Sequence, residues 1–206
     1  VADIQFEEDV NDFVFLWNAI PMFKRKILNL RTIEQSLETL KRNPTAEADI
    51  AIKPAKDQDN ASDLIIEYKQ KRPIRASLSF DDTGSKSTGK YQGNITVSLD
   101  NPLRLSDLFY VGVSHDLGGG DTGKRGNEAQ MLHYSVPYGY WLLSSNYSQT
   151  EYHQSVAGLT ETYIYSGSSE TYDVGIARII WRDSRSKLLR NGQIQNKKSW
   201  NYNDDT

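Results

Sequence analysis

Residues 75–116 read RASLSFDDTGSKSTGKYQGNITVSLDNPLRLSDLFYVGVSHD, and this stretch decides the fold. It contains three segments in which apolar and polar residues alternate, separated by the turn-forming sequences DDTGSKSTG and DNPLRLSD. Alternation with a period of two places the apolar residues on one face of a β-strand and the polar residues on the other. The apolar set is Ala76, Leu78, Phe80, Tyr91, Ile95, Val97, Leu99, Phe109, Val111 and Val113. The stretch therefore predicts three strands joined as antiparallel hairpins.

Such a sheet has two possible environments. In water its apolar face must be covered by a second sheet or a helix, whereas in a membrane β-barrel that face meets lipid and the polar face lines a wet lumen. Hydrophobic residues make up 37% of the 206 residues, and no run approaches the ~20 apolar residues of a transmembrane helix. The net charge of −3 offers no basic surface to nucleic acid, and the absence of cysteine excludes disulfides and Cys–zinc sites.

Residues 1–72 predict a small α+β unit with the element order β-α-α-β-β. Its second helix has the clearest limits, because Asn29 is a suitable N-cap and Pro44 follows the last turn. Pro21 is expected to end or bend the first helix. We expect both helices on one face of a three-stranded sheet. The predicted elements are a strand over Val1–Glu7, helices over Asp12–Phe23 and Leu30–Lys41, and strands over Ala48–Pro54 and Asp63–Lys69.

A short basic hinge, Gln70–Pro73, separates this unit from residues 74–206, where helical periodicity disappears. Four further strands are predicted there, at Ala129–Val136, Tyr140–Ser155, Thr171–Asp183 and Lys187–Trp200. We expect a long polar loop over residues 155–170. A β-bulge is expected near Ala177 and Arg178, where the alternation slips. Turns and long loops alternate along the chain, as they do in barrels with one periplasmic and one external end.

Six or seven strands leave a sheet with two open edges, which hydrocarbon does not tolerate. The sequence therefore predicts either a water-soluble sheet or the front part of a longer protein. The chain begins VADIQFEE, without an initiator methionine or a signal-peptide pattern. We therefore expect a processed or excised piece.

Four segments carry a resemblance to a known family: LNLRTIEQSLETLKRNP, SFDDTGSKSTGKYQGNITVSLDNPLRLSDLFYVGVSHD, YSVPYGYW and RIIWRDSRSK. They resemble the TpsB family, the outer-membrane transporters of two-partner (type V) secretion. That family includes haemolysin activators, the filamentous-haemagglutinin transporter and the CdiB proteins of contact-dependent inhibition. In it, two periplasmic POTRA domains precede a sixteen-stranded barrel that exports one large β-helical partner.

The resemblance implies that residues 1–72 are the second POTRA domain and residues 74–206 the N-terminal part of the barrel. The expected fold is thus an α+β POTRA domain followed by antiparallel transmembrane β-barrel strands that form a partial barrel. The implied location is the bacterial outer membrane, with the N-terminal domain in the periplasm. The implied partners are a secreted TpsA-type protein and outer-membrane lipid. The first POTRA domain and most of the barrel have no counterpart here, so we expect this segment to be incompetent in transport by itself.

Two sets of residues are candidates for contact with the exported chain. An exposed strand edge of a POTRA domain can bind an extended segment by β-augmentation. The candidate partner-binding residues beside such an edge are Ile33, Leu37, Ile50 and Ile52. The candidate lumen-facing residues, expected to contact the passing chain weakly, are Arg75, Lys90, Gln92 and Asn94.

Enzymatic chemistry is not indicated. Residues 118–124, GGGDTGK, nearly match a phosphate-binding loop, but Arg125 follows and a strand rather than a helix comes next, so no nucleotide is expected. The pair Asp81 and Asp82 is more typical of a hairpin turn than of a calcium loop, because no glutamate closes a twelve-residue loop. The three histidines lie on separate strands without a nucleophile-elbow motif. No enzyme, cofactor or metal site is predicted.

The alternative function is a soluble β-rich module that binds carbohydrate or another ligand, fused to a small α+β domain. The aromatic residues Trp141, Tyr147, Tyr163, Tyr165, Tyr172 and Trp181 suit stacking on sugars as well as the interfacial girdle of a barrel. Dependence on detergent separates the two hypotheses, because a lipid-facing band would be exposed in water.

Overall fold

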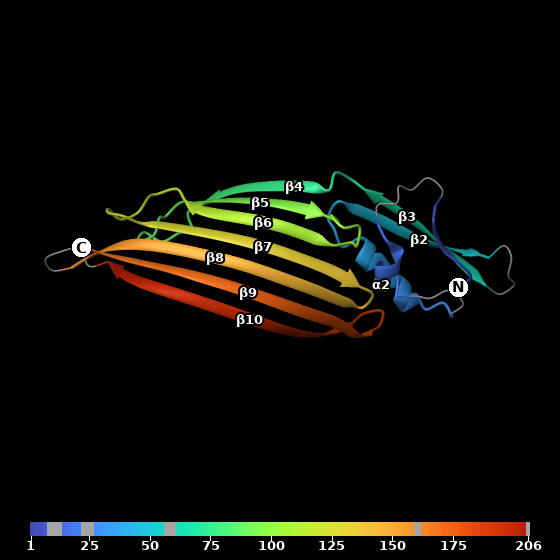
Figure 1. Ribbon diagram of the computed structural model, residues 1–206. Helices are drawn as coiled ribbons and strands as arrows, with labels where there is room; N and C mark the ends of the chain where they lie inside the picture. The colour runs from blue at the N-terminus through green and yellow to red at the C-terminus, as the bar shows by residue number, and fades with distance from the viewer. Residues whose placement is uncertain (8–13, 22–26, 56–60, 159–161, 205–206) are drawn as a thin grey trace.

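The computed structural model describes residues 1–7, 14–21, 27–55, 61–158 and 162–204. They form a three-stranded sheet with two helices and a seven-stranded antiparallel sheet. The small unit lies against one end of the large sheet (Figure 1). The predicted fold class, a POTRA-like α+β unit followed by an antiparallel sheet, is confirmed.

The small unit contains β1 (Ile4–Phe6), α1 (Leu16–Ala19), α2 (Leu30–Leu40), β2 (Ala46–Pro54) and β3 (Ser62–Gln70). Its strand order is β1-β3-β2, with β1 parallel and β2 antiparallel to the central β3. The element order β-α-α-β-β is the predicted one. Both long strands also agree with the prediction to within two residues at each end.

Helix α2 forms where the sequence predicts it. The side chain of Asn29 accepts a hydrogen bond from the backbone N–H of Arg31 at 2.9 Å, which caps the first turn. Helix α1 is shorter than the predicted range Asp12–Phe23, whose residues 12, 13, 22 and 23 lie outside the described residues. Ile20 is extended, with φ −111° and ψ 101°. The residue before a proline is disfavoured in helical conformation. Ile20, which precedes Pro21, is therefore extended, and α1 ends at Ala19.

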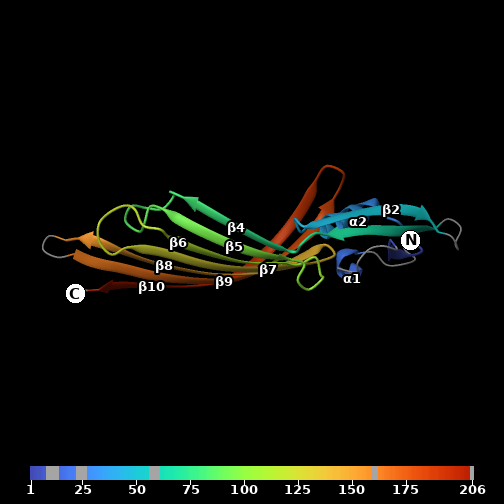
Figure 2. The ribbon, with the colours of Figure 1, turned by 90° about the horizontal axis from the view of Figure 1, so that it is seen from above.

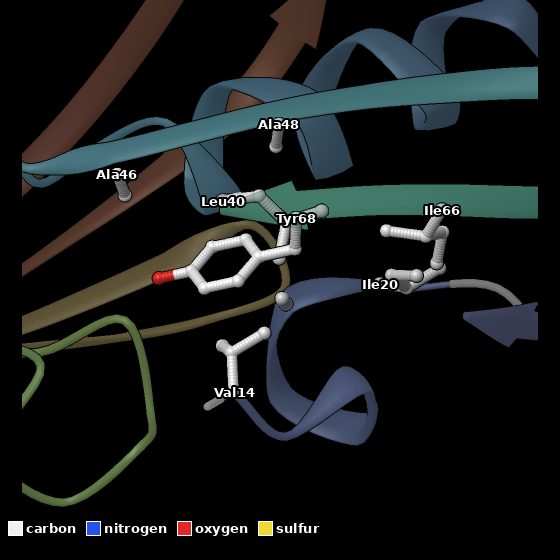
Figure 3. Packing of buried hydrophobic residues seen from close by; sticks show 8 residues of the cluster. Val14, Ile20, Leu40, Ala46, Ala48, Ile66 and Tyr68 are labelled. Carbon is white, nitrogen blue, oxygen red and sulfur yellow. The ribbon is translucent and has the colours of Figure 1, made fainter. Parts of the chain in front are cut away.

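The core of the small unit lies between the helices and one face of its sheet (Figure 3). Leu40 of α2 and Ile66 of β3 are fully buried there, together with the chain around α1. Tyr68 lies at the end of this core nearest the large sheet, and burial raises the pKa of its phenol to about 12. The core residues are Val14, Ala19, Ile20, Leu40, Ala46, Ala48, Ile66 and Tyr68.

The large sheet is a meander in which each strand pairs with its neighbours in sequence, in the order β10-β9-β8-β7-β6-β5-β4. This arrangement confirms the predicted antiparallel hairpins. Its strands are β4 (Ile74–Asp81), β5 (Gln92–Asp100), β6 (Leu108–Asp116), β7 (Gly126–Tyr138), β8 (Trp141–Ala157), β9 (Thr162–Arg182) and β10 (Lys187–Asp204). Figure 2 shows β8, β9 and β10 running nearly the whole length of the sheet.

One sequence prediction for this sheet is wrong, and another is confirmed with a small shift. Residues 155–170 are not a long loop: β9 begins at Thr162 and pairs with β8 as far as Ala157. Their many serine, threonine and glycine residues suggested a loop, but they pair as strands. The expected bulge is present at Ile180, two residues beyond Arg178, because Leu188 pairs with Trp181 while Leu189 pairs with Ile179.

At the end of the sheet away from the small unit, the β4–β5 and β6–β7 loops interlock. The backbone N–H groups of Lys90 and Tyr91 donate to the carbonyls of Gly119 and Gly118, at 3.2 and 3.1 Å. The glycine-rich loop therefore packs on its neighbouring loop. Asp81 accepts a hydrogen bond from the backbone of Thr83 at 3.1 Å, as predicted for a hairpin turn. Among the described helices, none is long and apolar enough to cross a membrane.

Candidate functional site

The outer face of the large sheet carries a continuous apolar band. One row of paired residues across five strands reads Val97, Val111, Leu132, Tyr147 and Tyr172. No described segment covers this face. Leu78 and Ile95, for example, are 60% and 54% exposed. An apolar face of this extent requires an apolar environment.

The band runs obliquely across the sheet. The row that contains Leu78, Ile95 and Val113 is apolar on β4 to β6, but it continues as Gln130 on β7, Gln149 on β8 and Glu170 on β9. On β7 to β9 the apolar residues lie nearer the small unit instead. Such an oblique band is expected where tilted strands cross a layer of constant thickness. Past it, the outer face of β8 and β9 is polar.

The inner face is polar and rich in hydroxyl and amide groups. Paired rows include Ser135 with Ser144, His133 with Asn146, and Asn146 with Asp173. Towards the far end, a groove of about 470 Å³ is lined by small polar side chains that include Ser148, Thr150, Thr171, Lys197 and Ser199. The face offers many weak hydrogen-bonding groups and few charges.

Three of the four candidate lumen residues lie on this inner face. Arg75 donates to the Asp100 carboxylate from Nε and Nη2, at 3.0 and 2.9 Å. Asn94 donates to Ser79 and Asp81, at 3.3 and 3.2 Å. Gln92 is buried, and its Nε2 donates to the Gly89 carbonyl at 2.9 Å.

Lys90 differs from the other three, because β5 begins at Gln92 and Lys90 belongs to the preceding loop. Its ammonium lies 3.9 Å from the Asp82 carboxylate and 5.5 Å from the centre of the Tyr91 ring. The turn-forming sequence DDTGSKSTG thus extends further than the alternating pattern suggests. The expectation that Lys90 lies on the same strand as Gln92 and Asn94 is wrong.

The candidate partner-binding residues flank an edge strand. β2 pairs only with β3 among the described strands, so the backbone along its other side forms a free edge beside α2. Ile33 is buried, while Leu37 and Ile50 are half-buried against the core of the small unit. Ile52 is 48% exposed. The first three residues therefore build the wall beside the edge, and Ile52 alone offers a large apolar surface there.

The junction between the two sheets holds the largest group of buried polar residues, and the sequence alone does not reveal it. Asp107 closes the β5–β6 turn by accepting from the backbone N–H groups of Leu103 and Leu105, each at 3.2 Å. Asn101, Arg104 and Ser106 of this turn have positive φ angles of 62°, 62° and 54°. Backbone strain of this kind is kept where surrounding contacts hold it, commonly at functional positions.

Side chains of the small unit reach into this turn. Asn43 donates to the Asp107 carbonyl at 3.0 Å, and Thr45 Oγ1 donates to the Asp100 carboxylate at 2.8 Å. Arg42 donates to the Ser106 carbonyl at 3.2 Å and to the hydroxyl of Ser135. The Asn-Pro and Ser-Asp pairs of NPLRLSD signal a turn, but their partners 55 to 64 residues earlier could not be read from the sequence.

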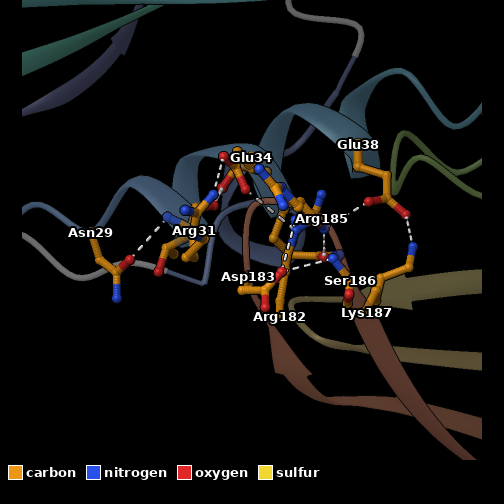
Figure 4. A network of polar contacts seen from close by, with 12 residues as sticks. Asn29, Arg31, Glu34, Glu38, Arg182, Asp183, Arg185, Ser186 and Lys187 are labelled. Carbon is orange, nitrogen blue, oxygen red and sulfur yellow. Dashed lines mark hydrogen bonds and ion pairs between the residues drawn. The ribbon is translucent and has the colours of Figure 1, made fainter.

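A second junction contact joins α2 to the β9–β10 hairpin (Figure 4). Arg182 lies 2.7 Å from Glu38 and 3.6 Å from Glu34, and Lys187 also pairs with Glu38. Partial burial acts to raise the pKa of Glu38, but the hydrogen bonds from Lys187 and Arg182 outweigh it and hold the pKa below its usual value. The hairpin is thereby fixed against the helix.

A cavity of about 410 Å³ opens between α2 and the sheet at this junction. Its wall on the α2 side includes Glu38, Thr39 and Arg42, and its wall on the sheet includes Leu142, Ala177 and Ile179. Leu142 and Ala177 pair with each other, one step along the inner face from Ser144 and Gly175. The inner face is therefore apolar beside the small unit.

Comparison with known proteins gives the same assignment from sequence and from structure. Residues 60–206 match the family described as haemolysin secretion/activation protein ShlB/FhaC/HecB, and residues 1–54 match the POTRA domain. The outer membrane transporter CdiB-2 of Burkholderia pseudomallei strain 1026b is 34% identical over 190 residues, which cover 92% of this chain and 32% of the relative. The hemolysin transporter protein HpmB of Proteus mirabilis is 29% identical over 187 residues, 88% of this chain and 32% of the relative.

Among solved structures, CdiB from Escherichia coli superposes with a TM-score of 0.86 at 28% identity, covering 99% of this chain and 38% of that chain. The chain thus spans about a third of the length of the curated relatives it matches. The matched relatives are outer-membrane and haemolysin transporters rather than enzymes. The chain belongs to the ShlB/FhaC/HecB family of two-partner secretion transporters of the bacterial outer membrane.

Proposed function

We propose that the protein containing this chain exports a large secreted partner, a TpsA-type β-helical protein, across the outer membrane as an unfolded polypeptide. Residues 1–72 act as the periplasmic POTRA domain, and residues 74–206 form the first strands of the transmembrane barrel. The observation that carries the proposal is the seven-stranded sheet, which has one polar face and one uncovered apolar band. Family membership supports the same direction of transport.

The size of the band supports a bilayer rather than a soluble binding module. On β9 the outer residues Tyr172, Val174, Ile176 and Ile180, with Arg178 among them, span nine residues, and a barrel strand crossing the bilayer at the usual tilt needs ~9–11. Barrels of the outer membrane carry an apolar band ~25 Å tall. A soluble sugar-binding sandwich would bury this face under a second sheet, and no described segment does so.

The polar face offers a path to an unfolded chain. The junction cavity lies where a polypeptide would enter, and its apolar wall at Leu142, Ala177 and Ile179 suits transient contact with apolar side chains. Further along, hydroxyl and amide groups such as Asn94 give weak hydrogen bonds that form and break without trapping the chain. Gln92 shapes this wall rather than binds cargo, because its side chain is buried and donates to the Gly89 carbonyl, whereas Arg75 and Asn94 keep exposed surface beside their partners.

Recognition of the partner is assigned to the free edge of β2. An extended segment of the partner adds to this edge through backbone hydrogen bonds, and its side chains contact the half-buried Leu37 and Ile50, whereas Ile33 is buried and supports this wall from within. Ile52 supplies the exposed apolar contact. Backbone pairing tolerates many sequences, which suits a partner that passes through the site segment by segment.

A secretion assay with the full-length transporter and its partner tests this site. Changing Ile52→Asp places a charge where the partner packs an apolar group, and we expect secretion to fall about fivefold, the equivalent of ~1 kcal/mol of lost contact. The matched control is Lys53→Asp, which alters the next residue of the same strand, on the opposite face of the small sheet.

The amounts of transporter in the outer membrane must be equal in all variants. Equal secretion by the Ile52→Asp and wild-type proteins would rule out the β2 edge as the recognition site. A full-length protein that stays monomeric and folded in detergent-free buffer would overturn the transporter proposal itself and favour the soluble binding module.

A further inference from the structure

Helix α1 is fastened to the large sheet by hydrogen bonds at both ends. The backbone N–H of Phe15 donates to the Arg104 carbonyl at 2.7 Å, and Asn18 Nδ2 donates to the Leu105 carbonyl at 2.6 Å. In return, the backbone N–H of Gly139 donates to the Asn18 carbonyl at 2.7 Å. Because a helix of four residues has little stability of its own, these contacts with the β5–β6 and β7–β8 turns fix its position.

Two side chains that precede the buried Asn18 are large, apolar and exposed. Trp17 is 64% exposed and Phe15 is 45% exposed, although the core of the small unit lies one turn away. The Trp17 ring lies 6.0 Å from the ring of Tyr138, which is itself 59% exposed. Rigid placement of a tryptophan in solvent is unfavourable unless something covers it.

Tyr138 connects the exposed side chains of Phe15 and Trp17 with the apolar outer face of the large sheet. It is the last residue of β7 and stands in phase with Val136, Tyr134 and Leu132, the apolar outer column of that strand. Its partner across the hairpin, Trp141, has the guanidinium of Arg178 at 4.7 Å from its ring. Aromatic side chains together with arginine, at the end of a lipid-facing column, are characteristic of the headgroup layer of a membrane.

We propose that α1 carries this aromatic belt from the barrel onto the POTRA domain, which thereby binds the headgroup layer of the periplasmic leaflet. The α1 patch consists of Phe15, Trp17, Leu103, Arg104 and Tyr138. The two apolar residues from α1 and the exposed Leu103 enter the interface, and the exposed Arg104 suits lipid phosphate. The occupant is a glycerophospholipid, because the patch continues a band that already faces lipid.

The inference rests on the proposed placement of residues 74–206 in the membrane. If the POTRA domain is held on one side by the leaflet and on the other by the Glu38–Arg182 contact, its orientation to the pore is fixed. The junction cavity and the free edge of β2 then keep a constant position relative to the lumen.

Depth-dependent fluorescence quenching tests the patch in the full-length transporter. Single cysteines are introduced at Trp17→Cys, with Phe15→Cys as a second position; residues 1–206 contain no cysteine, and any cysteine elsewhere in the full-length protein is first replaced by serine. Each is labelled with a small polarity-sensitive fluorophore and reconstituted into vesicles of phosphatidylethanolamine and phosphatidylglycerol. Lipids with a nitroxide near the headgroup quench from within the membrane, and iodide quenches from water.

Two further labelled positions serve as references, one for the lipid interior and one for water. Val113→Cys lies in the apolar band, and Lys53→Cys lies near the end of β2 away from the large sheet. We expect positions 15 and 17 to be quenched by the shallow nitroxide at least twice as strongly as position 53, with a blue-shifted emission. Position 113 is expected to respond more strongly to a nitroxide deep in the acyl chain.

The remaining outcomes overturn the inference in distinguishable ways. Quenching of positions 15 and 17 by iodide alone, with position 113 quenched by lipid, means that the α1 patch faces water. Protection from both quenchers means that protein covers the patch. Failure of lipid to quench position 113 as well would remove the membrane placement, and the proposed function with it.

Discussion

Single buried polar residues hold the junction together, and Asp107 illustrates how. Its carboxylate is fully buried and accepts two backbone N–H groups from a turn that contains three non-glycine residues at positive φ. Hydrogen bonds to a buried charged group contribute more than ordinary ones, because the group has already lost its hydration. The turn therefore keeps its strained shape only while Asp107 is present.

Replacing this carboxylate should destabilise the protein. We expect Asp107→Ala to lower the free energy of unfolding by about 2–4 kcal/mol, since two hydrogen bonds to a charged group are lost and two N–H groups are stranded. The midpoint of heat-modified electrophoretic mobility measures the change. Asp82→Ala is the control: the side chain is 70% exposed and its ion pair is long at 3.9 Å, so the midpoint should not move. Equal midpoints for both variants would contradict the role assigned to Asp107.

At the scale of elements, the sequence predicted the strands whose hydrophobic pattern is periodic. It did not predict the features that depend on contacts with distant parts of the chain. The strands β4 to β6 alternate because each has one apolar and one polar environment, so a period of two locates them. Residues 155–170 lack this contrast, because their apolar residues do not alternate with polar ones and serine, threonine and glycine are frequent, so they resemble a loop. Ile33 was predicted beside the strand edge but is buried, since a helical stripe does not reveal which of its residues the sheet covers. The junction pairs, such as Asn43 with Asp107, join distant parts of the chain and have no local pattern.

The contact between α2 and the β9–β10 hairpin should depend on pH. The pKa of Glu38 is lower in the folded protein than its reference value of 4.5, so its ion pairs stabilise the fold above that pH. This stabilisation is lost as the pH falls through the lowered pKa. Because the side chain is 45% exposed, solvent screening limits the effect to less than about 1 kcal/mol.

A Glu38→Gln variant makes the effect measurable. We expect its unfolding midpoint to lie below that of the wild type at pH 7, and the difference to shrink and vanish as the pH falls below 4.5 through the lowered pKa of Glu38. Glu47→Gln serves as control, because its ion pair with Lys71 is exposed on both sides and contributes no measurable difference. A difference between wild type and Glu38→Gln that persists at low pH would show that shape, not charge, matters at this position.

At the scale of the whole molecule, the described sheet ends in two strands, β4 and β10, that each pair on one side only. Unpaired backbone groups are not tolerated in hydrocarbon, so these edges need partners before the sheet can cross a membrane. The sequence predicted this from the strand count alone. The chain covers only about a third of the length of the relatives it matches.

Residues 1–206 alone should therefore not form a pore. We expect no stable ion conductance from this segment in planar lipid bilayers, whereas the full-length transporter should conduct. The physical reason is the cost of leaving two strand edges without hydrogen bonds in lipid. Discrete, reproducible channel openings from the segment alone would contradict this expectation, unless crosslinking shows that several copies close a barrel together.

The polar outer surface of β8 and β9 has a consequence for what lies outside the cell. β9 contains 21 residues, about 70 Å at the usual strand rise, and its apolar part accounts for less than half of that length. In the proposed membrane placement the remainder extends beyond the lipid, with Gln149, Glu151 and Glu170 on its outer side. An exported polypeptide would leave the pore at the far end of this polar extension of β8 and β9, at a distance from the densely packed sugars at the bilayer surface. The same extension would be the first part of the transporter that an antibody or a bacteriophage contacts.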